Sequence, residues 1–132
     1  MKKEEYKALN ERFIENIVKN PDVKELRGGV FYRAVESGSG EGEVKPRSVV
    51  TCHYKGSLID GMVFDSSYER NCPEAFRVND LISGFQIALV NMHKGDHWIV
   101  YIPADKGYGA KPAGKIPGYS TLIFEIELIG VM

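Results

Sequence analysis

The most constraining feature of the sequence is the strict alternation in its last segment, TLIFEIELI. Apolar residues take every second position there, with glutamates between them, which is the pattern of a β-strand with one buried face. The dipeptide Asp60-Gly61 predicts a tight two-residue hairpin, because both of its positions tolerate positive φ. The strands that we predict span residues 30–35, 49–58, 62–65, 76–78, 96–103 and 121–129.

Two other segments have the period of a helix. Apolar residues recur at steps of three and four within residues 1–20, and Pro21 ends this pattern. Residues 81–91 form a single helical stretch between strands. One helix can cover only one face of a sheet, so the sequence predicts an α+β fold. We expect residues 1–25 to be an N-terminal helix with a connector, and residues 26–132 to form one domain.

The charge balance limits the classes of partner. Lys and Arg number 17, Asp and Glu number 18, and the formal net charge is −1. Such a chain has no global electrostatic reason to bind nucleic acid or an anionic membrane. The sequence contains no long apolar run and no signal-peptide core, so we expect a cytoplasmic protein. A periplasmic protein or a lipoprotein is expected instead if an upstream signal is missing. Cys52 and Cys72 are expected to be free thiols.

Motifs for covalent or metal chemistry are not found in the sequence. There is no Gly-rich phosphate loop, nucleophile elbow or pair of cysteines at metal spacing. His93 and His97 are separated by Gly95 in an expected turn, so we predict neither a metal site nor a cofactor. Aromatic density at strand ends is the remaining signal. These rings either fill one core or line an apolar ligand pocket, and composition alone favours the core.

Four strings favour the pocket. VVTCHYKGSLIDGMVFDSS, NDLISGF, YIPADKGYG and IPGYSTLIFEIEL occur in this order and resemble the signature stretches of FKBP-type peptidyl-prolyl cis/trans isomerases. The lead-in GGVFYRAVESGSGEG is similar to that of the bacterial macrophage infectivity potentiator (Mip) branch. The resemblance covers about residues 28–128. It implies an FKBP-like antiparallel half-barrel of five or six strands, wrapped around the short helix at 81–91, with the ligand pocket between helix and sheet.

The resemblance also implies an activity and a set of site residues. The activity is rotation about X–Pro amides in folding proteins, which needs no nucleophile, metal or cofactor. The Ile82 N–H would hold a substrate carbonyl, Tyr108 would donate its hydroxyl near the prolyl carbonyl, and Asp65 would act electrostatically. Tyr54 would hold Asp65 in place. The apolar walls would be Phe64, Phe76, Leu81, Phe85, Ile116 and Phe124.

Three departures from the family pattern support an alternative. Phe85 stands where most active members have Trp, Glu74 replaces an aromatic residue of some members, and Gly118 replaces a proline in a loop that is one residue short. The alternative is a weakly catalytic or non-catalytic binding module, or chaperone, for Pro-containing or apolar segments. The resemblance further implies tacrolimus-type macrocycles as inhibitors, and either a monomer or a homodimer formed through the N-terminal helix.

Overall fold

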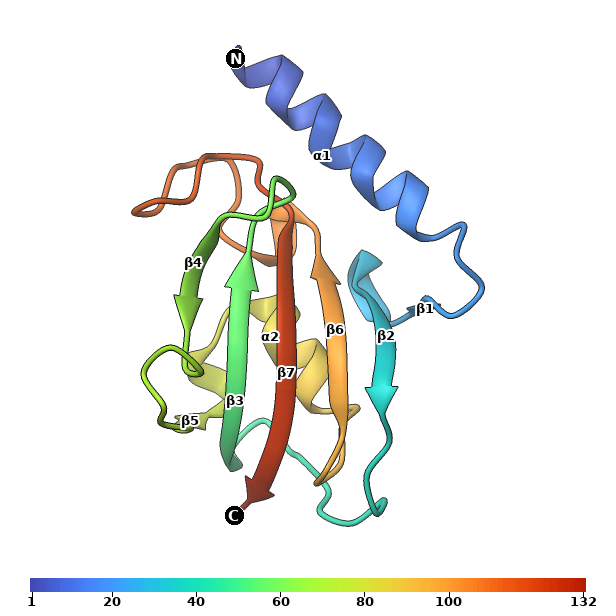
Figure 1. The fold of residues 1–132 in the computed structure, drawn as a ribbon, viewed down its shortest axis with the longest axis vertical. Helices are drawn as coiled ribbons and strands as arrows, with labels where there is room; N and C mark the ends of the chain where they lie inside the picture. Colours follow the sequence, from blue (N-terminus) through green and yellow to red (C-terminus); the bar gives the residue numbers. More distant parts are fainter.

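The computed structural model describes all 132 residues as one antiparallel sheet of seven strands with two α-helices (Figure 1). The helices are α1 (Lys3–Ile17) and α2 (Ser83–Leu89). The strands are β1 (Lys24–Glu25), β2 (Phe31–Glu36), β3 (Val49–Ser57), β4 (Val63–Ser66), β5 (Glu74–Arg77), β6 (His97–Ile102) and β7 (Leu122–Val131). Three 3₁₀ turns are η1 (Arg27–Gly29), η2 (Val78–Asp80) and η3 (Ala104–Lys106).

The order of strands explains the half-barrel shape. Strands follow one another as β1-β2-β6-β7-β3-β4, and β5 pairs with β3 as well. β4 pairs with the C-terminal half of β3 and β5 pairs with its N-terminal half. The chain therefore leaves the edge of β3 after residue 66 and returns at residue 74. The polar loop between these two positions lies beside the candidate site described below.

The core lies between the inner face of the sheet and α2, which lies behind the sheet in Figure 1. The alternation predicted for the last segment is confirmed, because Leu122, Phe124, Ile126 and Leu128 are all 4% exposed or less. Glu125 of β7 faces the opposite way and pairs with side chains of the outer face. Burial of alternate apolar residues along the long central strands thus fixes which face of the sheet receives α2.

Helix α2 is shorter than the predicted stretch of residues 81–91. Leu81 and Ile82 are extended rather than helical, and the regular helix covers Ser83–Leu89. Gly84 lies so close to β6 that a Cβ atom there would collide with the side chain of Ile102. This close approach seats a helix of seven residues directly on the sheet.

The prediction of a tight two-residue hairpin at Asp60-Gly61 is wrong. The strands are joined by five residues, Leu58 to Met62, with the Leu58 N–H donating to the Met62 carbonyl at 3.0 Å. Gly61 has positive φ, at 91°, but Asp60 does not. The carboxylate of Asp60 instead accepts a hydrogen bond from the Met62 N–H at 2.9 Å. That side-chain turn competes with the primed hairpin turn.

The predicted antiparallel sheet is confirmed, and it has seven strands rather than five or six because β1 adds one. Lys24 and Glu25 pair with Tyr32 and Phe31 of β2. The side chains of Lys24 and Glu25 are charged and exposed. A strand of two charged residues has no alternation for a sequence pattern to detect. The last two residues of the expected connector are therefore hydrogen-bonded to the sheet.

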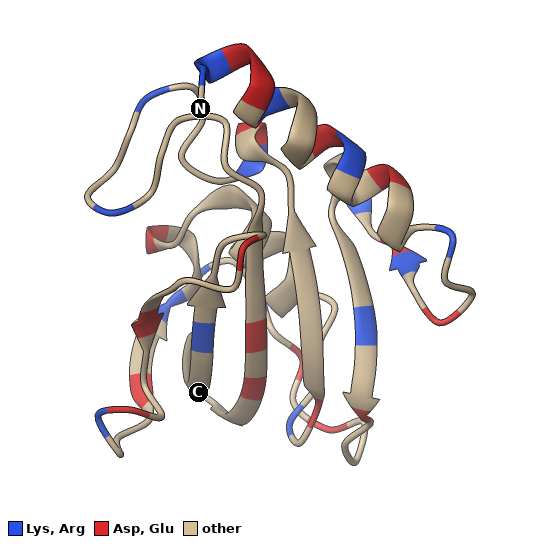
Figure 2. Cartoon of the chain, turned by 45° about the horizontal axis from the view of Figure 1, so that its top comes forward, with Lys and Arg blue, Asp and Glu red and all other residues tan.

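Helix α1 crosses one end of the sheet and carries charges of both signs (Figures 1 and 2). Its only buried residue is Asn10, and none of the residues in the buried apolar core lies on it. Phe13 contacts Tyr101 with ring centroids 6.3 Å apart, while Leu9 and Val18 are 38% and 39% exposed. No helix has both the length and the apolar character needed to cross a bilayer.

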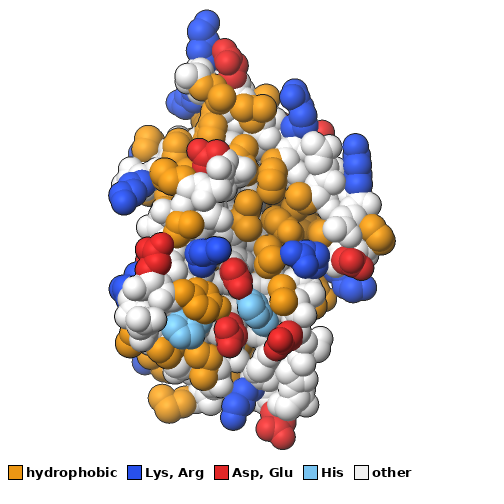
Figure 3. Space-filling view, in the orientation of Figure 1, with side chains coloured by type: hydrophobic (Ala, Val, Ile, Leu, Met, Phe, Trp, Pro, Cys, Tyr) orange, Lys and Arg blue, Asp and Glu red, His pale blue; other side chains and the backbone are white.

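On the outer face of the sheet, polar and apolar side chains occupy different regions. Figure 3 shows histidine and acidic side chains together over the central strands, with a hydrophobic patch between them and α1. His97 Nε2 lies 2.6 Å from a carboxylate oxygen of Glu125. The rings of His53 and Tyr68 stack at 4.6 Å, and the Tyr68 hydroxyl donates to Glu127. These polar side chains are therefore paired with one another.

Candidate active site

Five aromatic rings converge between α2 and the sheet. They come from five different elements: Tyr54 from β3, Phe64 from β4, Phe76 from β5, Phe85 from α2 and Phe124 from β7. The ring of Phe85 lies 5.0 Å from Phe124, 6.1 Å from Tyr54 and 6.4 Å from Phe76, between centroids. Phe85 and Phe124 are buried, whereas Phe64 and Phe76 are half-buried. The cluster therefore has a dry floor and partly open walls.

A glycine on β3 makes this packing feasible. A Cβ atom on Gly56 would lie 2.6 Å from the ring of Phe64 and 2.8 Å from the ring of Phe124. Real Cβ atoms do not approach aromatic carbons so closely, so both rings depend on the missing side chain. Gly56 was not singled out from the sequence. A glycine inside an otherwise β-branched and aromatic strand is the signal that could have identified it.

The residue before the first turn of α2, Ile82, has a backbone N–H without a hydrogen-bond partner. Leu81 and Ile82 are half-buried and pack against the core cluster. The Ile82 carbonyl accepts from the Gln86 backbone N–H, but the Ile82 N–H has no partner within the protein. An N–H at the start of a helix commonly lacks an intrahelical partner. Here it is a donor available to a carbonyl group beside an aromatic floor.

The loop from residue 107 to residue 121 contains two more of the predicted site residues. Ile116 is 6% exposed and belongs to the core cluster. Tyr108 is 45% exposed, and its hydroxyl makes no hydrogen bond within the protein. The loop is pinched by a bridge between Ala113 and Ile116. Tyr108 therefore stands at the surface as a second donor without a partner.

A hydrogen-bonded triad forms the polar side of the site. The Tyr54 hydroxyl donates to Asp65 Oδ2 at 2.7 Å, and Arg70 Nη1 donates to Asp65 Oδ1 at 2.7 Å. Arg70 Nη2 also donates to the Tyr54 hydroxyl at 2.9 Å. The other edge of the guanidinium binds Glu74 at 3.0–3.1 Å. Asp65 is thus held on both oxygens, and the predicted contact between Tyr54 and Asp65 is present.

These contacts set the charge state of the triad. Burial works against a charge on Asp65, but hydrogen bonds from Arg70 and Tyr54 outweigh it and hold its pKa below the ordinary value. Burial, followed by the hydrogen bond to Asp65, raises the pKa of Tyr54 to about 12. Hydrogen bonds to Asp65 and Tyr54 raise the pKa of Arg70 further. At neutral pH the triad is a carboxylate, a neutral phenol and a guanidinium.

Sequence reasoning missed Arg70. It lies five residues after Asp65 in the loop between β4 and β5, a spacing that no helix or strand period picks out. The signal that could have found it is its isolation. Arg70 is the only basic residue among positions 66–74, which otherwise contain polar, acidic and proline residues.

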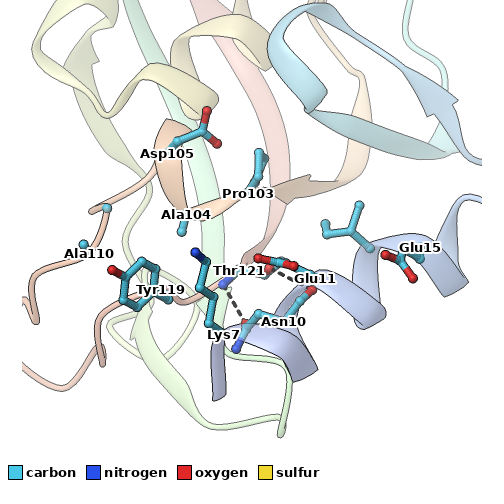
Figure 4. Close-up of a pocket in the computed structure, with 12 residues that line it drawn as sticks. Lys7, Asn10, Glu11, Glu15, Pro103, Ala104, Asp105, Ala110, Tyr119 and Thr121 are labelled. Atoms are coloured by element: carbon cyan, nitrogen blue, oxygen red, sulfur yellow. Dashed lines mark hydrogen bonds between the residues drawn. The ribbon is translucent and has the colours of Figure 1, made fainter. Parts of the chain in front are cut away.

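A separate cavity of about 580 Å³ lies between α1, the segment 103–105 and both ends of the 107–121 loop (Figure 4). None of the predicted site residues lines it. The aromatic cluster is the better candidate site, because apolar surface and the unpaired Ile82 N–H meet there, as in most ligand pockets. The residues also offer no metal ligands, since no group of three His, Cys, Asp or Glu side chains is close enough together.

Comparisons with known proteins agree with this geometry. A family model described as FKBP-type peptidyl-prolyl cis-trans isomerase matches residues 40–129. The solved structure of a peptidyl-prolyl cis-trans isomerase from Pseudomonas syringae pv. tomato superimposes with a TM-score of 0.91 at 36% identity. That match covers 99% of this chain and 96% of the solved one.

Two curated relatives point to the same family. The macrophage infectivity potentiator of Trypanosoma cruzi is 40% identical over 126 residues, which is 95% of this chain and 64% of the relative. The outer membrane protein MIP of Legionella longbeachae is 39% identical over 131 residues, covering 98% of this chain and 56% of the relative. This chain thus spans between half and two thirds of these two relatives. Their names lend no support to the expected cytoplasmic location. The chain belongs to the family of FKBP-type peptidyl-prolyl cis-trans isomerases.

Proposed function

We propose that this chain accelerates cis/trans rotation about X–Pro amides in protein substrates. The observation that carries the proposal is the dry aromatic floor around Phe85, with the unpaired Ile82 N–H beside it. Family membership, over residues 40–129, supports the same reaction. No bond is broken in this rotation, so it requires neither a nucleophile nor a metal.

The proposed chemistry follows from the amide itself. Partial double-bond character gives the C–N bond a rotation barrier of ~18–20 kcal/mol. The planar amide is more charge-separated than the twisted one, so removal of water destabilises the planar form more. A pocket floored by Phe85 and Phe124 supplies such a dry environment. Catalysis then consists of binding the twisted amide better than the planar one.

The polar groups have separate roles in this proposal. The Ile82 N–H binds a substrate carbonyl, and the Tyr108 hydroxyl donates to the region of the prolyl carbonyl. Asp65 acts through a fixed negative charge at the pocket edge rather than by moving a proton. This role is supported by the two donors that hold its carboxylate, Tyr54 and Arg70. Phe64, Phe76, Leu81 and Ile116 form the apolar walls.

The substrates and ligands follow from the same surface. We propose Pro-containing segments of folding proteins as substrates, with an apolar residue before proline, because the walls are apolar. Tacrolimus-type macrocycles are proposed as inhibitors that occupy the same pocket. The name of the Legionella relative supports an outer-membrane location for the whole protein. Fractionation of cells that express it from its natural gene would test this location.

We propose that the 132-residue chain is a monomer. The stripe of α1 that could pair with a second copy is partly used within the chain, through Tyr6, Asn10 and Phe13. Within the helix only Leu9 remains as an exposed large apolar residue, and Val18 directly follows it. Sedimentation velocity should give the mass of one chain, and a species of twice that mass would establish the homodimer instead.

The activity is tested by following exchange of a short X–Pro peptide by NMR or by a coupled protease assay. Uncatalysed exchange takes ~10–100 s, so acceleration by the folded protein is easily seen. Tyr108→Phe removes one hydroxyl at the proposed site and should lower kcat/KM. Tyr32→Phe removes a hydroxyl on β2, where the ring stacks on Trp98, and should not. Folded protein that leaves exchange at the uncatalysed rate would refute the enzyme and favour the binding module.

A further inference from the structure

The loop of residues 107–121 carries two residues of the proposed site, Tyr108 and Ile116, and its closing end contacts α1. We infer that Tyr6 and Asn10 of α1 are positioning residues, which hold this loop and thereby Tyr108 in the geometry that turnover requires. The inference rests on the proposed function and assigns part of it to a helix outside the core. No residue of α1 lies in the aromatic cluster.

Asn10 makes the central contact. Its Oδ1 accepts a hydrogen bond from the Thr121 N–H at 2.7 Å, drawn as a dashed line in Figure 4. The Thr121 hydroxyl donates to the Asn10 carbonyl at 3.4 Å. The Asn10 Nδ2 donates to the Tyr6 carbonyl at 2.8 Å, which fixes the orientation of the amide. Asparagine is a poor residue for a helix interior, yet Asn10 is the one buried residue of α1.

Two further contacts reach the preceding residues of the loop. The Ser120 hydroxyl donates to the Pro117 carbonyl at 2.7 Å, so the Tyr6 hydroxyl is the donor in its 2.8 Å contact with Ser120 Oγ. The ammonium group of Lys7 lies 5.0 Å from the centroid of the Tyr119 ring, within the range of a cation–π contact. Helix α1 thus holds three consecutive residues at the end of the loop.

These three residues are tied to the start of the same loop. Tyr119 has positive φ, at 64°, and its N–H donates to the Gly109 carbonyl at 2.9 Å. A Cβ atom on Gly118 would collide with the Ala110 carbonyl, so the two limbs of the loop touch along their backbones. Gly109 directly follows Tyr108. Movement of the closing limb therefore moves the opening limb and Tyr108 with it.

Apolar packing does not replace these hydrogen bonds. A cavity of about 580 Å³ extends from Lys7 towards Glu15 of α1, and another of about 430 Å³ lies between Met1 to Tyr6 and the tip of the loop. Figure 4 shows the first of them beside the contact between Asn10 and Thr121. Where such spaces exist, dispersion contacts are missing. The polar contacts at Tyr6 and Asn10 are consequently the main link from α1 to the loop.

A double-mutant cycle in the full 132-residue chain tests the inference. Asn10→Ala should lower kcat/KM on an X–Pro peptide on the order of two- to fivefold, at most the effect of one net hydrogen bond. The loss should be much smaller in a Tyr108→Phe background, because the effect travels through Tyr108. Arg12 is exposed and makes no hydrogen bond or ion pair, so Arg12→Ala is the matched control. Equal losses in both backgrounds would overturn the inference.

Amide hydrogen exchange supplies a readout that does not depend on activity. Exchange of the Tyr119 N–H should be faster in Asn10→Ala than in the parent and unchanged in Arg12→Ala. An unchanged rate in Asn10→Ala would also overturn the inference. Tyr6→Phe removes a single hydroxyl and takes the place of Asn10→Ala in both experiments if that variant does not fold. A parent without turnover would refute the proposed function, whereas the exchange rates would still decide whether α1 holds the loop.

Discussion

At the scale of single residues, the hydrogen bond from Arg70 contributes most to lowering the pKa of Asp65. Without Arg70, burial would remain while the strongest opposing hydrogen bond is lost, so Arg70→Met should raise the pKa of Asp65. A lowered carboxyl pKa contributes stability above the unfolded-state value, and this stability is lost as the pH falls through the folded-state value. The free energy of unfolding should therefore fall less on acidification in Arg70→Met than in the parent.

NMR titration of the Asp65 carboxyl carbon measures the first effect directly, and urea unfolding between about pH 2 and 5 measures the second. Arg77→Met is the control, since Arg77 lies on β5 without an ion pair. An Asp65 titration that is the same in parent and Arg70→Met would show that Arg70 does not set its charge.

The triad also predicts how turnover depends on pH. Asp65 has a pKa below its ordinary value and Tyr54 has a pKa of about 12, so neither group changes its charge near neutrality. We expect kcat/KM to be constant from about pH 6 to 8. A bell-shaped profile in this range, measured by peptide exchange, would contradict a purely electrostatic role for Asp65.

Phe85 is expected to set the depth of the proposed pocket. It is 3% exposed among three other rings, and Trp at this position would add apolar surface facing a ligand. About 50 Å² of added contact contributes on the order of 1 kcal/mol, so Phe85→Trp should tighten macrocycle binding roughly fivefold. Overpacking can offset this by ~1–3 kcal/mol. Calorimetric titration decides the matter, and equal or weaker binding at unchanged melting temperature would mean that residue 85 does not contact the ligand in the way that the resemblance implies.

At the scale of elements, the seat of α2 on β6 is the most easily disturbed contact. A Cβ atom at Gly84 would collide with Ile102, so Gly84→Ala should lower the free energy of unfolding by about 1–3 kcal/mol despite the better helix propensity of alanine. Gly130 on β7 has open space around it and no positive φ, so Gly130→Ala is the control. Urea unfolding of both variants measures the difference, and equal stabilities would show that α2 can shift away from the sheet.

Sequence reasoning succeeded for elements whose burial is periodic and failed where a backbone contact decides. The alternation of β7 was predicted correctly, because one of its faces is buried along its whole length. The strand β1 was missed, since its two residues are exposed and only backbone pairing defines them. At Asp60 a side-chain hydrogen bond selected a longer turn than the dipeptide suggests. Such local competition leaves no periodic signal.

The residues of the candidate site likewise fall into those that the sequence predicted and those that it missed. Its aromatic residues occur within strings that resemble a known family, and the fold brings Tyr54, Phe85 and Phe124 together. Arg70 and Gly56 were missed because their importance comes from what approaches them in space. Arg70 meets a carboxylate across a loop, and Gly56 leaves room for two rings.

At the scale of the whole molecule, the fold has one core, and α1 does not share it. The buried apolar cluster begins at Val30 and ends at Leu128. Helix α1 adds three hydrogen bonds through Tyr6 and Asn10, the cation–π contact of Lys7, and the ring contact of Phe13 with Tyr101. Hydrogen bonds contribute ~1 kcal/mol each, so loss of the helix should cost about 2–4 kcal/mol. That is less than the 5–15 kcal/mol by which a typical domain is stable.

A shortened chain of residues 21–132 should therefore fold, with a lower melting temperature than the full chain. It keeps β1 paired with β2 and all of the core cluster. Its kcat/KM should fall at least as far as that of Asn10→Ala, because both remove the contact that holds Thr121. Thermal unfolding and peptide exchange on the same preparation measure both quantities. Full activity in the shortened chain would show that the 107–121 loop keeps its geometry without α1, and an unfolded product would place α1 within the folding unit itself.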